Sequence, residues 1–472
     1  MNSRLIATLC ALLIGYLSLN AKNIRLTEQE ATLNGRHLCT DYIQSALDKC
    51  SRSGGGVVTL SPGRYLTGTL YLRNHVELHL ERGAYLLGDV HVTDKNIYPK
   101  QALIYAEDIE DAGISGQGTI DGQSNTEGFL SQGFRVNDNK RPNGLFFYRC
   151  KNISFSDFNI LNAGNWTFRL QECDGVRING IFLKSLAQGN NDGIDVDARN
   201  VVISNCILET DDDGICLKSD NLDFMPENIT VSNCVIASNC NPIKFGTASC
   251  AGFRNVSISN CVIRRTTESN IWHWEERYDD LPKGVLTGLS GIAIESADGG
   301  CIEHVVINNI TMEGVITPIF ICLNRRSGGN KGIIRDIHIS NITATCEGNI
   351  PSIISGIPDR YISDITLQNI HVEHHGGKEA MTSRLREALT SYPENRMFGR
   401  LNPAAGLFVR HAKNIKVEGL SVTMRHADKR PTVVADDVNV MTLRDLTSRN
   451  ILGEPVQNIE STGITLDHKD IR

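Results

Sequence analysis

One seven-residue pattern decides the fold that this sequence predicts. It reads NVVISNC at residues 200–206, NITVSNC at 228–234 and NVSISNC at 255–261. Each copy alternates apolar and polar side chains with a period of two, as a short β-strand does, and asparagine marks its boundaries. Related copies, some bounded by aspartate, continue toward the C-terminus at 305–310, 336–342, 364–370 and 414–417.

The spacing of these copies predicts a β-solenoid. Several copies lie about 22 to 30 residues apart, which is the length of one coil of such a fold, and longer insertions separate the others. Stacked coils bring aliphatic side chains together inside and place asparagines in rows at the bends, where they tolerate left-handed backbone and hydrogen-bond to one another. We therefore expect an all-β parallel solenoid, with a short amphipathic helix at residues 40–50 that caps the first coil.

The N-terminal residues predict export. Residues 1–21 contain one cation, Arg4, followed by an apolar run at 5–19, which is typical of a secretory signal peptide cleaved after Ala21. The run is short for a membrane span, and no other apolar stretch is long enough. A lipid anchor on Cys10 stays open. No Pro/Ser-rich linker divides residues 22–472, so we expect one periplasmic or secreted domain.

Charge and cysteine content exclude several classes of partner. The formal net charge is −7, and loss of Arg4 with the signal makes it −8, which argues against nucleic acid binding. Of the 14 cysteines, Cys10 leaves with the signal, and the odd number that remains argues against a complete disulfide framework. No paired CxxC motif indicates zinc. We predict no metal, no other cofactor and a monomer.

Two acidic segments indicate chemistry. They read NDGIDV at residues 191–196 and DDGICL at 212–217, and they occupy equivalent places in neighbouring coils. Carboxylates that are held close together raise one another's pKa and destabilise the fold unless water, a cation or a substrate compensates. The simplest reading is that these carboxylates cleave a glycosidic bond.

A period of two also predicts which side chains face outward. Stacked apolar pairs fix the register, namely Ile194 with Val196, Ile215 with Leu217, Ile243 with Phe245, and Ile292 with Ile294. Side chains between, just before and just after these pairs then share an outer groove. The residues just after the pairs form its outermost column: Asp197, Lys218, Gly246 and Glu295. The candidate residues of the groove are Asp192, Asp195, Asp212, Asp213, Lys218, Asn241, Lys244, Glu295 and, one coil earlier, Arg169.

This groove suits an inverting glycosidase. Such an enzyme needs one carboxylic acid to protonate the leaving oxygen and one carboxylate to activate water on the opposite face of the sugar. Crowded carboxylates can keep one proton near neutral pH. The neighbouring cations suit a sugar acid as substrate.

At these residues the chain resembles glycoside hydrolase family 28, the polygalacturonase and rhamnogalacturonan hydrolase family. The family's Asn-Thr-Asp motif falls on residues 190–192, and its Asp-Asp pair on Asp212 and Asp213; SPGRYLTGTL at 61–70 and ISGQGTIDG at 114–122 resemble its opening coils. The resemblance implies a right-handed parallel β-helix and cleavage of pectic polysaccharides. It also implies that Asp212 is the general acid, while Asp192 and Asp213 hold and activate the water.

Two departures from the family pattern concern specificity. The family's polygalacturonases carry Gly-His-Gly where this chain has Cys240-Asn241-Pro242, and Arg-Ile-Lys where it has Ala293-Ile294-Glu295. These changes favour another pectic linkage, such as a galacturonosyl-rhamnose bond, or an exo-acting enzyme. Lys244, Lys218 and Arg169 are the alternative candidates to hold a uronate carboxylate, whereas Glu295 either binds hydroxyls or repels a second uronate.

An aromatic insertion lies beside the predicted groove. Residues 268–284 contain Trp272 and Trp274, whose rings either stack on sugars and wall off one end of the cleft, or only pack the insertion onto the helix. The first alternative favours exo action. Residues 324–326 and 410–411 are further candidates to reach the groove from strand ends, the alternative being solvated surface charge.

Two other functions remain open. In a pectate-lyase-like enzyme the carboxylates would bind Ca²⁺, and Lys218 or Lys244 would abstract the proton α to the uronate carboxyl. In a non-catalytic carbohydrate-binding β-solenoid the acidic bend would only be solvated. Chelator sensitivity and unsaturated products distinguish the lyase from a hydrolase.

Overall fold

The structure is a computed structural model that describes residues 22–27, 34–134, 140–326, 331–381, 383–399 and 402–471. The predicted signal peptide, including Cys10, lies outside the described residues. Within them, no helix is long and apolar enough to cross a membrane.

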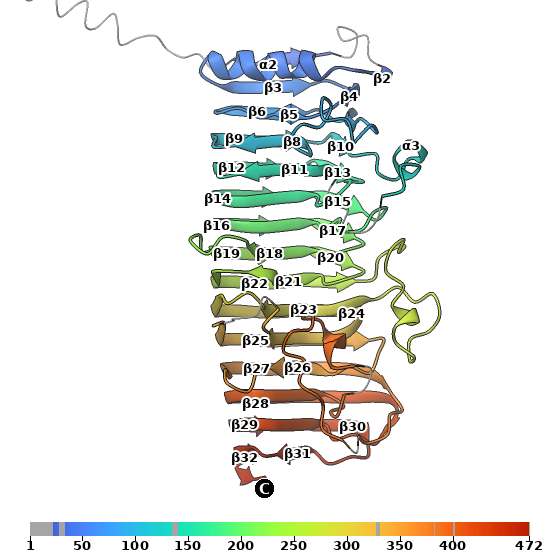
Figure 1. The fold of residues 1–472 in the computed structure, drawn as a ribbon, viewed down its shortest axis with the longest axis vertical. Coiled ribbons are helices and arrows are strands. Elements are labelled where there is room, and N and C mark those ends of the chain that lie inside the picture. Colours follow the sequence, from blue (N-terminus) through green and yellow to red (C-terminus); the bar gives the residue numbers. More distant parts are fainter. Residues whose placement is uncertain are drawn as a thin grey trace, which may run out of the picture.

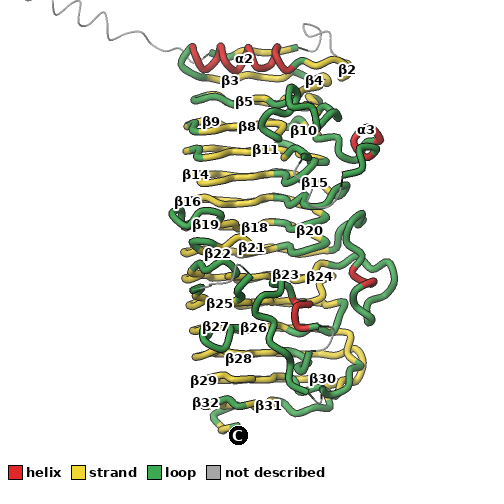
Figure 2. Tube along the Cα trace, in the orientation of Figure 1, coloured by secondary structure: helices red, strands yellow, loops and turns green. Residues whose placement is uncertain are grey.

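The described chain forms a right-handed parallel β-helix, so the fold prediction is confirmed. Its strands belong to one sheet that winds through successive coils, and all its ladders are parallel except the terminal pair β32 and β33. The coils stack along one axis from the N-terminal to the C-terminal end (Figures 1 and 2). Buried aliphatic residues of every coil join in one continuous core.

The elements follow one another in a regular order. Before the acidic bend they are β1 (Ile24–Leu26), β2 (Asn34–Leu38), α2 (Thr40–Arg52), β3 (Gly56–Leu60), β4 (Gly63–Thr67), β5 (Leu70–Tyr71), β6 (Val76–Leu80), β7 (Ala84–Gly88), β8 (Ala102–Glu107), β9 (Glu110–Gly116), β10 (Thr119–Asp121), α3 (Glu127–Leu130), β11 (Asn143–Tyr148), β12 (Lys151–Ser156), β13 (Asn159–Leu161), β14 (Phe168–Asn179), β15 (Phe182–Ser185), β16 (Ile194–Ser204) and β17 (Ile207–Thr210). After it they are β18 (Ile215–Ser219), β19 (Glu227–Ser232), β20 (Val235–Ser238), β21 (Ile243–Ser249), β22 (Gly252–Arg264), η1 (Trp274–Glu276), β23 (Gly288–Ser296), β24 (Cys301–Leu323), β25 (Ile333–Cys346), β26 (Ser352–Ser355), β27 (Ile362–Gly376), η2 (Asn395–Phe398), β28 (Leu407–Asp428), β29 (Val433–Arg444), β30 (Thr447–Ile451), β31 (Val456–Ile459), β32 (Thr462–Leu466) and β33 (Lys469–Asp470).

The helix α2 covers the first coil, as predicted. It lies over β3 at the N-terminal end of the stack (Figure 1) and buries Ile43, Leu47 and Cys50. Thr40 begins the helix but does not cap it, because its hydroxyl accepts a hydrogen bond from the backbone N–H of Gly68 instead. The helix therefore shields apolar side chains that a neighbouring coil covers elsewhere in the stack.

Asparagine ladders hold the bends together. Asn255 donates a side-chain hydrogen bond to Asn228, and Asn228 donates one to Asn200, both at 3.0 Å. All three residues have φ between 54° and 58°, the left-handed region that asparagine tolerates better than most residues. The seven-residue pattern thus encodes the bend as well as the strand.

The register of the central strands is confirmed for the buried pairs. Ile194 pairs with Ile215, which pairs with Ile243, which pairs with Ile292, and all are at most 2% exposed. The outermost column of the prediction is wrong, because the register shifts after Leu217 and Ser219 pairs with Ser249. Lys218 therefore lies at a bulge rather than opposite Gly246.

The cysteines contribute to packing. Every cysteine in the described part of the chain is free. Cys206, Cys234 and Cys261 follow the repeated asparagine in successive coils and are buried, as expected for small core side chains.

Candidate active site

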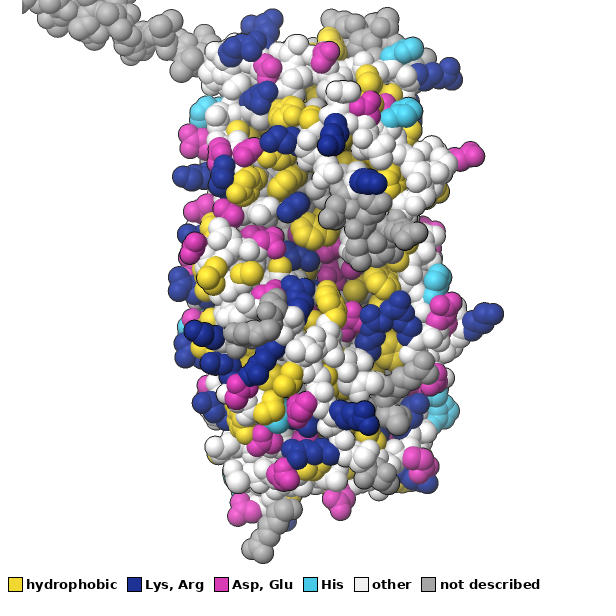
Figure 3. Space-filling model, in the orientation of Figure 1, with side chains coloured by type: hydrophobic (Ala, Val, Ile, Leu, Met, Phe, Trp, Pro, Cys, Tyr) yellow, Lys and Arg dark blue, Asp and Glu magenta, His cyan; other side chains and the backbone are white. Residues whose placement is uncertain are grey.

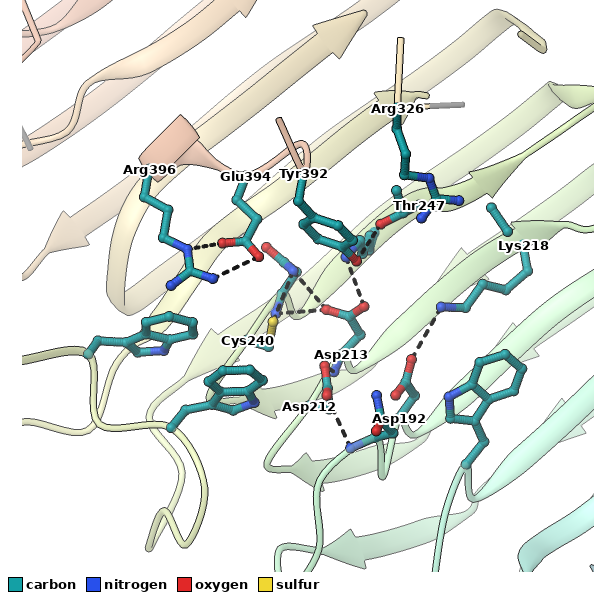
Figure 4. A pocket seen from close by; sticks show the side chains of 17 residues that line it. Asp192, Asp212, Asp213, Lys218, Cys240, Thr247, Arg326, Tyr392, Glu394 and Arg396 are labelled. Atoms are coloured by element: carbon teal, nitrogen blue, oxygen red, sulfur yellow. Dashed lines mark hydrogen bonds and ion pairs between the residues drawn. The ribbon is translucent and has the colours of Figure 1, made fainter. Parts of the chain in front are cut away.

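A cavity of about 430 Å³ opens on the outer face of β16, β18 and β21. In the space-filling view, acidic and hydrophobic side chains meet in a recess near the middle of this face (Figure 3). Seventeen residues line the cavity, and Figure 4 shows their side chains. They are Trp166, Asn190, Asp192, Asp212, Asp213, Lys218, Cys240, Asn241, Lys244, Thr247, Ala248, Trp272, Trp274, Arg326, Tyr392, Glu394 and Arg396.

Four lining residues occupy the same place in successive coils. Trp166, Asp192, Asp213 and Asn241 each precede a strand by two residues, and the residues that they precede pair in one ladder: Phe168, Ile194, Ile215 and Ile243. Parallel stacking of equivalent positions therefore builds this wall directly. Asp192, Asp213 and Asn241 were predicted from the sequence, whereas Trp166 was not, although extending the register by one coil places it in the same column.

Asp212 has the environment of a carboxylic acid. Its carboxyl group accepts hydrogen bonds from the backbone N–H groups of Asn190, at 3.2 Å, and Asp213, at 3.0 Å. Its own backbone N–H donates to the side-chain oxygen of Asn191 at 2.9 Å. Burial, with the negative charges of Asp192 and Asp213 added, holds the pKa of Asp212 well above its ordinary value. Asp212 thus retains a proton where an exposed aspartate would have lost it.

Asp213 lies beside Asp212, but its pKa is shifted in the opposite direction. Asn241 donates a hydrogen bond from Nδ2 to Asp213 Oδ1 at 2.7 Å, and Lys244 Nζ lies 3.1 Å from Asp213 Oδ2. Burial alone would raise the pKa of Asp213, but Lys244 and Lys218 outweigh it and hold the pKa below its ordinary value. Asp213 is therefore a carboxylate over the range in which Asp212 keeps its proton.

Asp192 completes the acidic centre through Lys218. Lys218 Nζ lies 3.3 Å from Asp192 Oδ2 and 3.2 Å from Asp195 Oδ1. Burial raises the pKa of Asp192, Lys218 opposes this effect, and Asp213 adds to it. In Figure 4, Asp192 and Asp212 lie close together below Asp213 at the centre of the site.

This arrangement can carry out general acid–base catalysis. Two neighbouring carboxyl groups whose pKa values are driven apart supply a proton donor and a base at one pH. An oxygen of Asp212, an oxygen of Asp213 and the sulfur of Cys240 all lie within 4.8 Å of one another. Because their pKa values differ, one aspartate can hold a proton for the leaving group while the other, as a carboxylate, activates a water molecule for attack.

The same side chains are the candidates for metal binding. Among the described residues, Asp192 with Asp195 and Cys216, and Asp212 with Asp213 and Cys240, could each surround an ion. Lysine ammonium groups already lie 3.1 to 3.3 Å from carboxylates of both groups. The protein itself thus supplies the positive charge that a cation would bring.

Three of the predicted binding residues do not line the cavity. Asp195 lies behind Lys218, and burial together with Asp192 holds its pKa well above the ordinary value. Glu295 is 1% exposed and reaches the cavity only through Thr247, whose hydroxyl donates to it at 3.3 Å; burial raises its pKa to about 8. The guanidinium of Arg169 packs 5.1 Å from the ring centre of Trp166.

The predicted aromatic insertion does border the site. Trp272 and Trp274 stack in parallel, with ring centres 4.9 Å apart, and both line the cavity. Arg277 packs 5.4 Å from the ring centre of Trp274 and Arg396 packs 5.3 Å from it. Trp274 is buried against the protein, and both rings line the cavity, so stacking on a sugar stays a prediction.

A second segment was missed by sequence reasoning. Residues 383–399 lead from β27 toward β28 and pass in front of coils in the C-terminal half of the stack (Figure 1). They bring Tyr392, Glu394 and Arg396 into the cavity wall. The hydroxyl groups of Tyr392 and Thr247 lie 2.7 Å apart, although the two residues are 145 positions apart in the sequence. No period or motif marks this segment, so the sequence carried no signal for it.

The two segments also contact each other. The hydroxyl of Tyr278, in the aromatic insertion, donates to Asn395 Oδ1 at 2.6 Å, and Asn395 Nδ2 donates to the backbone oxygen of Leu289 at 2.7 Å. Residues of both segments line the cavity. Of the arginine candidates at strand ends, Arg326 lines the cavity, whereas Arg410 is buried beside Asp436, 3.2 Å away, and does not.

Comparison with known proteins relates this site to one family. Residues 67–269 match the family model described as glycosyl hydrolases family 28. An endo-polygalacturonase of Pectobacterium parmentieri is 24% identical over 360 residues, which is 70% of this chain and 83% of that protein. The matched segment includes Asp192, Asp212 and Asp213.

Solved structures share the fold. An exopolygalacturonase from Thermotoga maritima superposes with a TM-score of 0.61 at 22% identity, over 74% of this chain and 87% of that one. A family 28 exopolygalacturonase from Yersinia enterocolitica superposes with a TM-score of 0.60 at 17% identity, over 95% and 79%.

Proposed function

Residues 67–269 of this chain belong to glycoside hydrolase family 28, and on this premise we propose an inverting, exo-acting hydrolase of pectic chains. Its substrates are galacturonosyl linkages of homogalacturonan or rhamnogalacturonan. Asp212 is the general acid, while Asp192 and Asp213 hold and activate the attacking water.

One observation carries the proposal: Asp212 and Asp213 are adjacent in the same cavity, with their pKa values shifted in opposite directions. Asn241 and Lys244 keep Asp213 ionised and oriented through contacts of 2.7 and 3.1 Å. A protonated acid and an ionised base are the two groups that hydrolysis of a glycoside requires.

Stereochemistry follows from where water can bind. The nearest oxygens of Asp212 and Asp213 lie within 4.8 Å, closer than the roughly 6.5–9.5 Å that leaves room for water between two carboxyl groups. So short a separation is typical of a retaining pair, and the inversion that we propose requires the water to bind toward Asp192, beside the pair rather than between its members. Proton NMR of the first product formed checks this: the inverted anomer is expected, and the retained anomer would contradict it.

Two arginines support an acidic substrate. Lys218 and Lys244 are at most 10% exposed and hold the buried carboxylates, so neither can leave them to bind substrate. The side chains of Arg326 and Arg396 are 33% exposed, and each uses Nε and Nη2 on one acid, Asp298 or Glu394. In Figure 4 they lie on opposite sides of Asp212 and Asp213, so a uronate on either side of the cleaved bond meets an arginine.

The substitution Arg396→Gln tests this role. Because a charge-assisted hydrogen bond contributes about 1.5–3 kcal/mol, we expect KM for galacturonate oligosaccharides to rise by about 10- to 100-fold. The same variant should lose its preference for the free acid over the methyl ester at the terminal sugar. Arg396→Lys should retain part of it.

A matched control removes the charge pair together. Arg396→Gln leaves Glu394 without this partner and close to a substrate acid, so part of the KM effect is repulsion. The double variant Arg396→Gln/Glu394→Gln removes that repulsion while still lacking the arginine. If the double variant binds the free acid as tightly as the wild type does, Arg396 does not recognise the carboxylate.

The lyase alternative is less consistent with the lysines. Burial alone would lower the pKa of Lys244, but Asp213 and Glu295 outweigh it, so the pKa lies well above the ordinary value. Lys218 has its pKa raised in the same way by Cys216, Asp195 and Asp192. A general base needs a pKa near the working pH, which neither lysine has.

Product analysis tests the function directly. Purified protein with a chelator present is incubated with homogalacturonan and with rhamnogalacturonan backbone oligosaccharides. Saturated monosaccharide is expected, and the substrate that releases it identifies the linkage. Products that absorb in the ultraviolet, or activity abolished by chelator, would establish a lyase; no release from either glycan would remove pectin as the substrate.

The cellular context is part of the same proposal. We propose that residues 1–21 are a signal peptide and that residues 22–472 form one periplasmic or secreted domain that acts as a monomer. N-terminal sequencing of the protein recovered from its native host should begin at Lys22. Light scattering of the purified protein should give a single-chain mass.

A further inference from the structure

The three consecutive aspartates of the acidic bend have separate surroundings. Asp212 and Asp213 line the cavity, whereas Asp211 is fully buried and points to the aromatic insertion instead. Its carboxylate accepts hydrogen bonds from the backbone N–H groups of Asn270, at 3.0 Å, and Ile271, at 2.8 Å. The residue next to the proposed acid therefore binds the backbone of the segment that carries the tryptophans.

Two side chains extend this contact to the rings themselves. Ser269 Oγ donates to Asp211 Oδ1 at 2.8 Å and accepts from the backbone N–H of Trp272 at 3.2 Å. Asn239 Nδ2 donates to Asp211 Oδ1 at 2.7 Å, and the backbone oxygen of Asn239 accepts from Trp274 Nε1 at 2.5 Å. Each tryptophan is thus connected to the Asp211 carboxylate through one intermediate residue, Ser269 for Trp272 and Asn239 for Trp274.

We propose that Asp211 is a positioning residue that holds the Trp272–Trp274 wall of the cavity and so sets specificity for chain ends. This specificity role rests on the proposed exo-hydrolase function. Four donors converge on one buried carboxylate, which is more than a solvated bend requires. Asp211 does not line the cavity described above and is not a catalytic residue.

The anchor is local. The base of the insertion is held separately by Glu209, whose carboxylate accepts from the backbone N–H of Thr267 at 2.5 Å and from its hydroxyl at 2.6 Å. Loss of Asp211 therefore loosens the tip of the insertion, around Trp272 and Trp274, without detaching its base.

The substitution Asp211→Asn is the test. Asparagine has nearly the same volume as aspartate. Its NH₂ group, however, would face groups that donate hydrogen bonds to the Asp211 carboxylate, so hydrogen bonds from Ser269, Asn270 or Ile271 are lost. Since stacking of aromatic rings contributes modestly to binding, we expect KM for short oligosaccharides to rise about 5- to 10-fold with kcat changed less than about 2-fold. Internal cleavage products should appear from polymeric substrate.

A spectroscopic readout is independent of activity. The chain has three tryptophans, so in a Trp166→Phe background the fluorescence comes from Trp272 and Trp274 alone. Asp211→Asn in that background should red-shift the emission and increase acrylamide quenching. If the wild type cleaves no pectic glycan, the proposed function fails, yet this measurement still tests the anchor.

Three further variants make the result decisive. Ser269→Ala removes the link to Trp272 without touching an acid and should change KM and quenching in the same direction, by less. Glu268→Gln, an exposed acid of the same segment, should change neither. In a Trp272→Ala background, Asp211→Asn should no longer raise KM.

Two outcomes would overturn the proposal. Unchanged quenching and KM in Asp211→Asn would show that the wall holds its place without Asp211. A fall in kcat at unchanged KM and quenching would show that Asp211 acts on the acid pair rather than on the wall.

Discussion

Asp212→Asn is expected to lower kcat by about 10²- to 10⁴-fold, the range that a positioned general acid contributes. Asparagine has nearly the same shape but carries no acidic proton. The pKa of Asp212 is held well above its ordinary value by burial, with Asp192 and Asp213 adding to the effect. The same pKa should set the basic limb of the pH profile, because activity falls as Asp212 loses its proton.

A substrate with a better leaving group distinguishes a variant that lacks the general acid from a variant that has lost its fold. The nitrophenolate of a nitrophenyl galacturonide departs without protonation, so Asp212→Asn should hydrolyse this substrate far closer to the wild-type rate than it hydrolyses the natural linkage. Asp223→Asn, at an exposed acid on the following loop, serves as control and should keep full activity. Equal losses on both substrates would assign Asp212 a role other than proton donation.

Lys244→Met is expected to have the largest effect on stability. Lys244 Nζ lies 3.1 Å from Asp213 Oδ2, and both side chains are 4% exposed. Removing one partner of a buried ion pair typically costs about 3–5 kcal/mol, because the remaining charge is left uncompensated. Lys218 also acts on Asp213 and remains, so the free energy of unfolding should fall by about 3 kcal/mol.

The pH dependence of this loss has a definite sign. In the wild type the pKa of Asp213 is depressed, so its stabilising contribution is present above the unfolded pKa of about 3.9 and is lost as pH falls through the folded pKa. Without Lys244, burial dominates and raises the pKa, so the folded variant binds a proton that the unfolded chain does not. The stability difference between wild type and variant should therefore shrink as pH falls from 7 toward 4.

Chemical denaturation at several pH values measures this difference. Lys244→Arg keeps the charge and should retain most of the stability. A difference between wild type and Lys244→Met that stays constant from pH 7 to pH 4 would mean that the lysine contributes through packing rather than through Asp213. Loss of activity at a retained melting temperature would point to a direct role in substrate binding.

The sequence by itself determined the repeat and the acidic centre. NVVISNC and its copies encode strand and bend together, since alternation buries the aliphatic residues and asparagine takes left-handed φ at the boundary. In a parallel stack, equivalent positions of successive coils become neighbours. Aligning two acidic segments was therefore enough to bring Asp192 and Asp213 to one wall, and the register confirms it.

The tertiary structure decided what surrounds that wall. Periodicity placed Lys218 in the groove, but it did not foresee the register shift after Leu217, where β21 has two more residues than β18, or the contacts of Lys218 with Asp192 and Asp195. Tyr392, Glu394 and Arg396 reach the cavity on a segment without periodicity, so only its contacts fix its path. The separate task of Asp211 depends on a segment 58 to 60 residues later folding back onto it. Local periodicity encodes the coil, because neighbouring coils repeat the same pattern. Insertions between coils follow no repeat, so their positions depend only on the side chains that they contact.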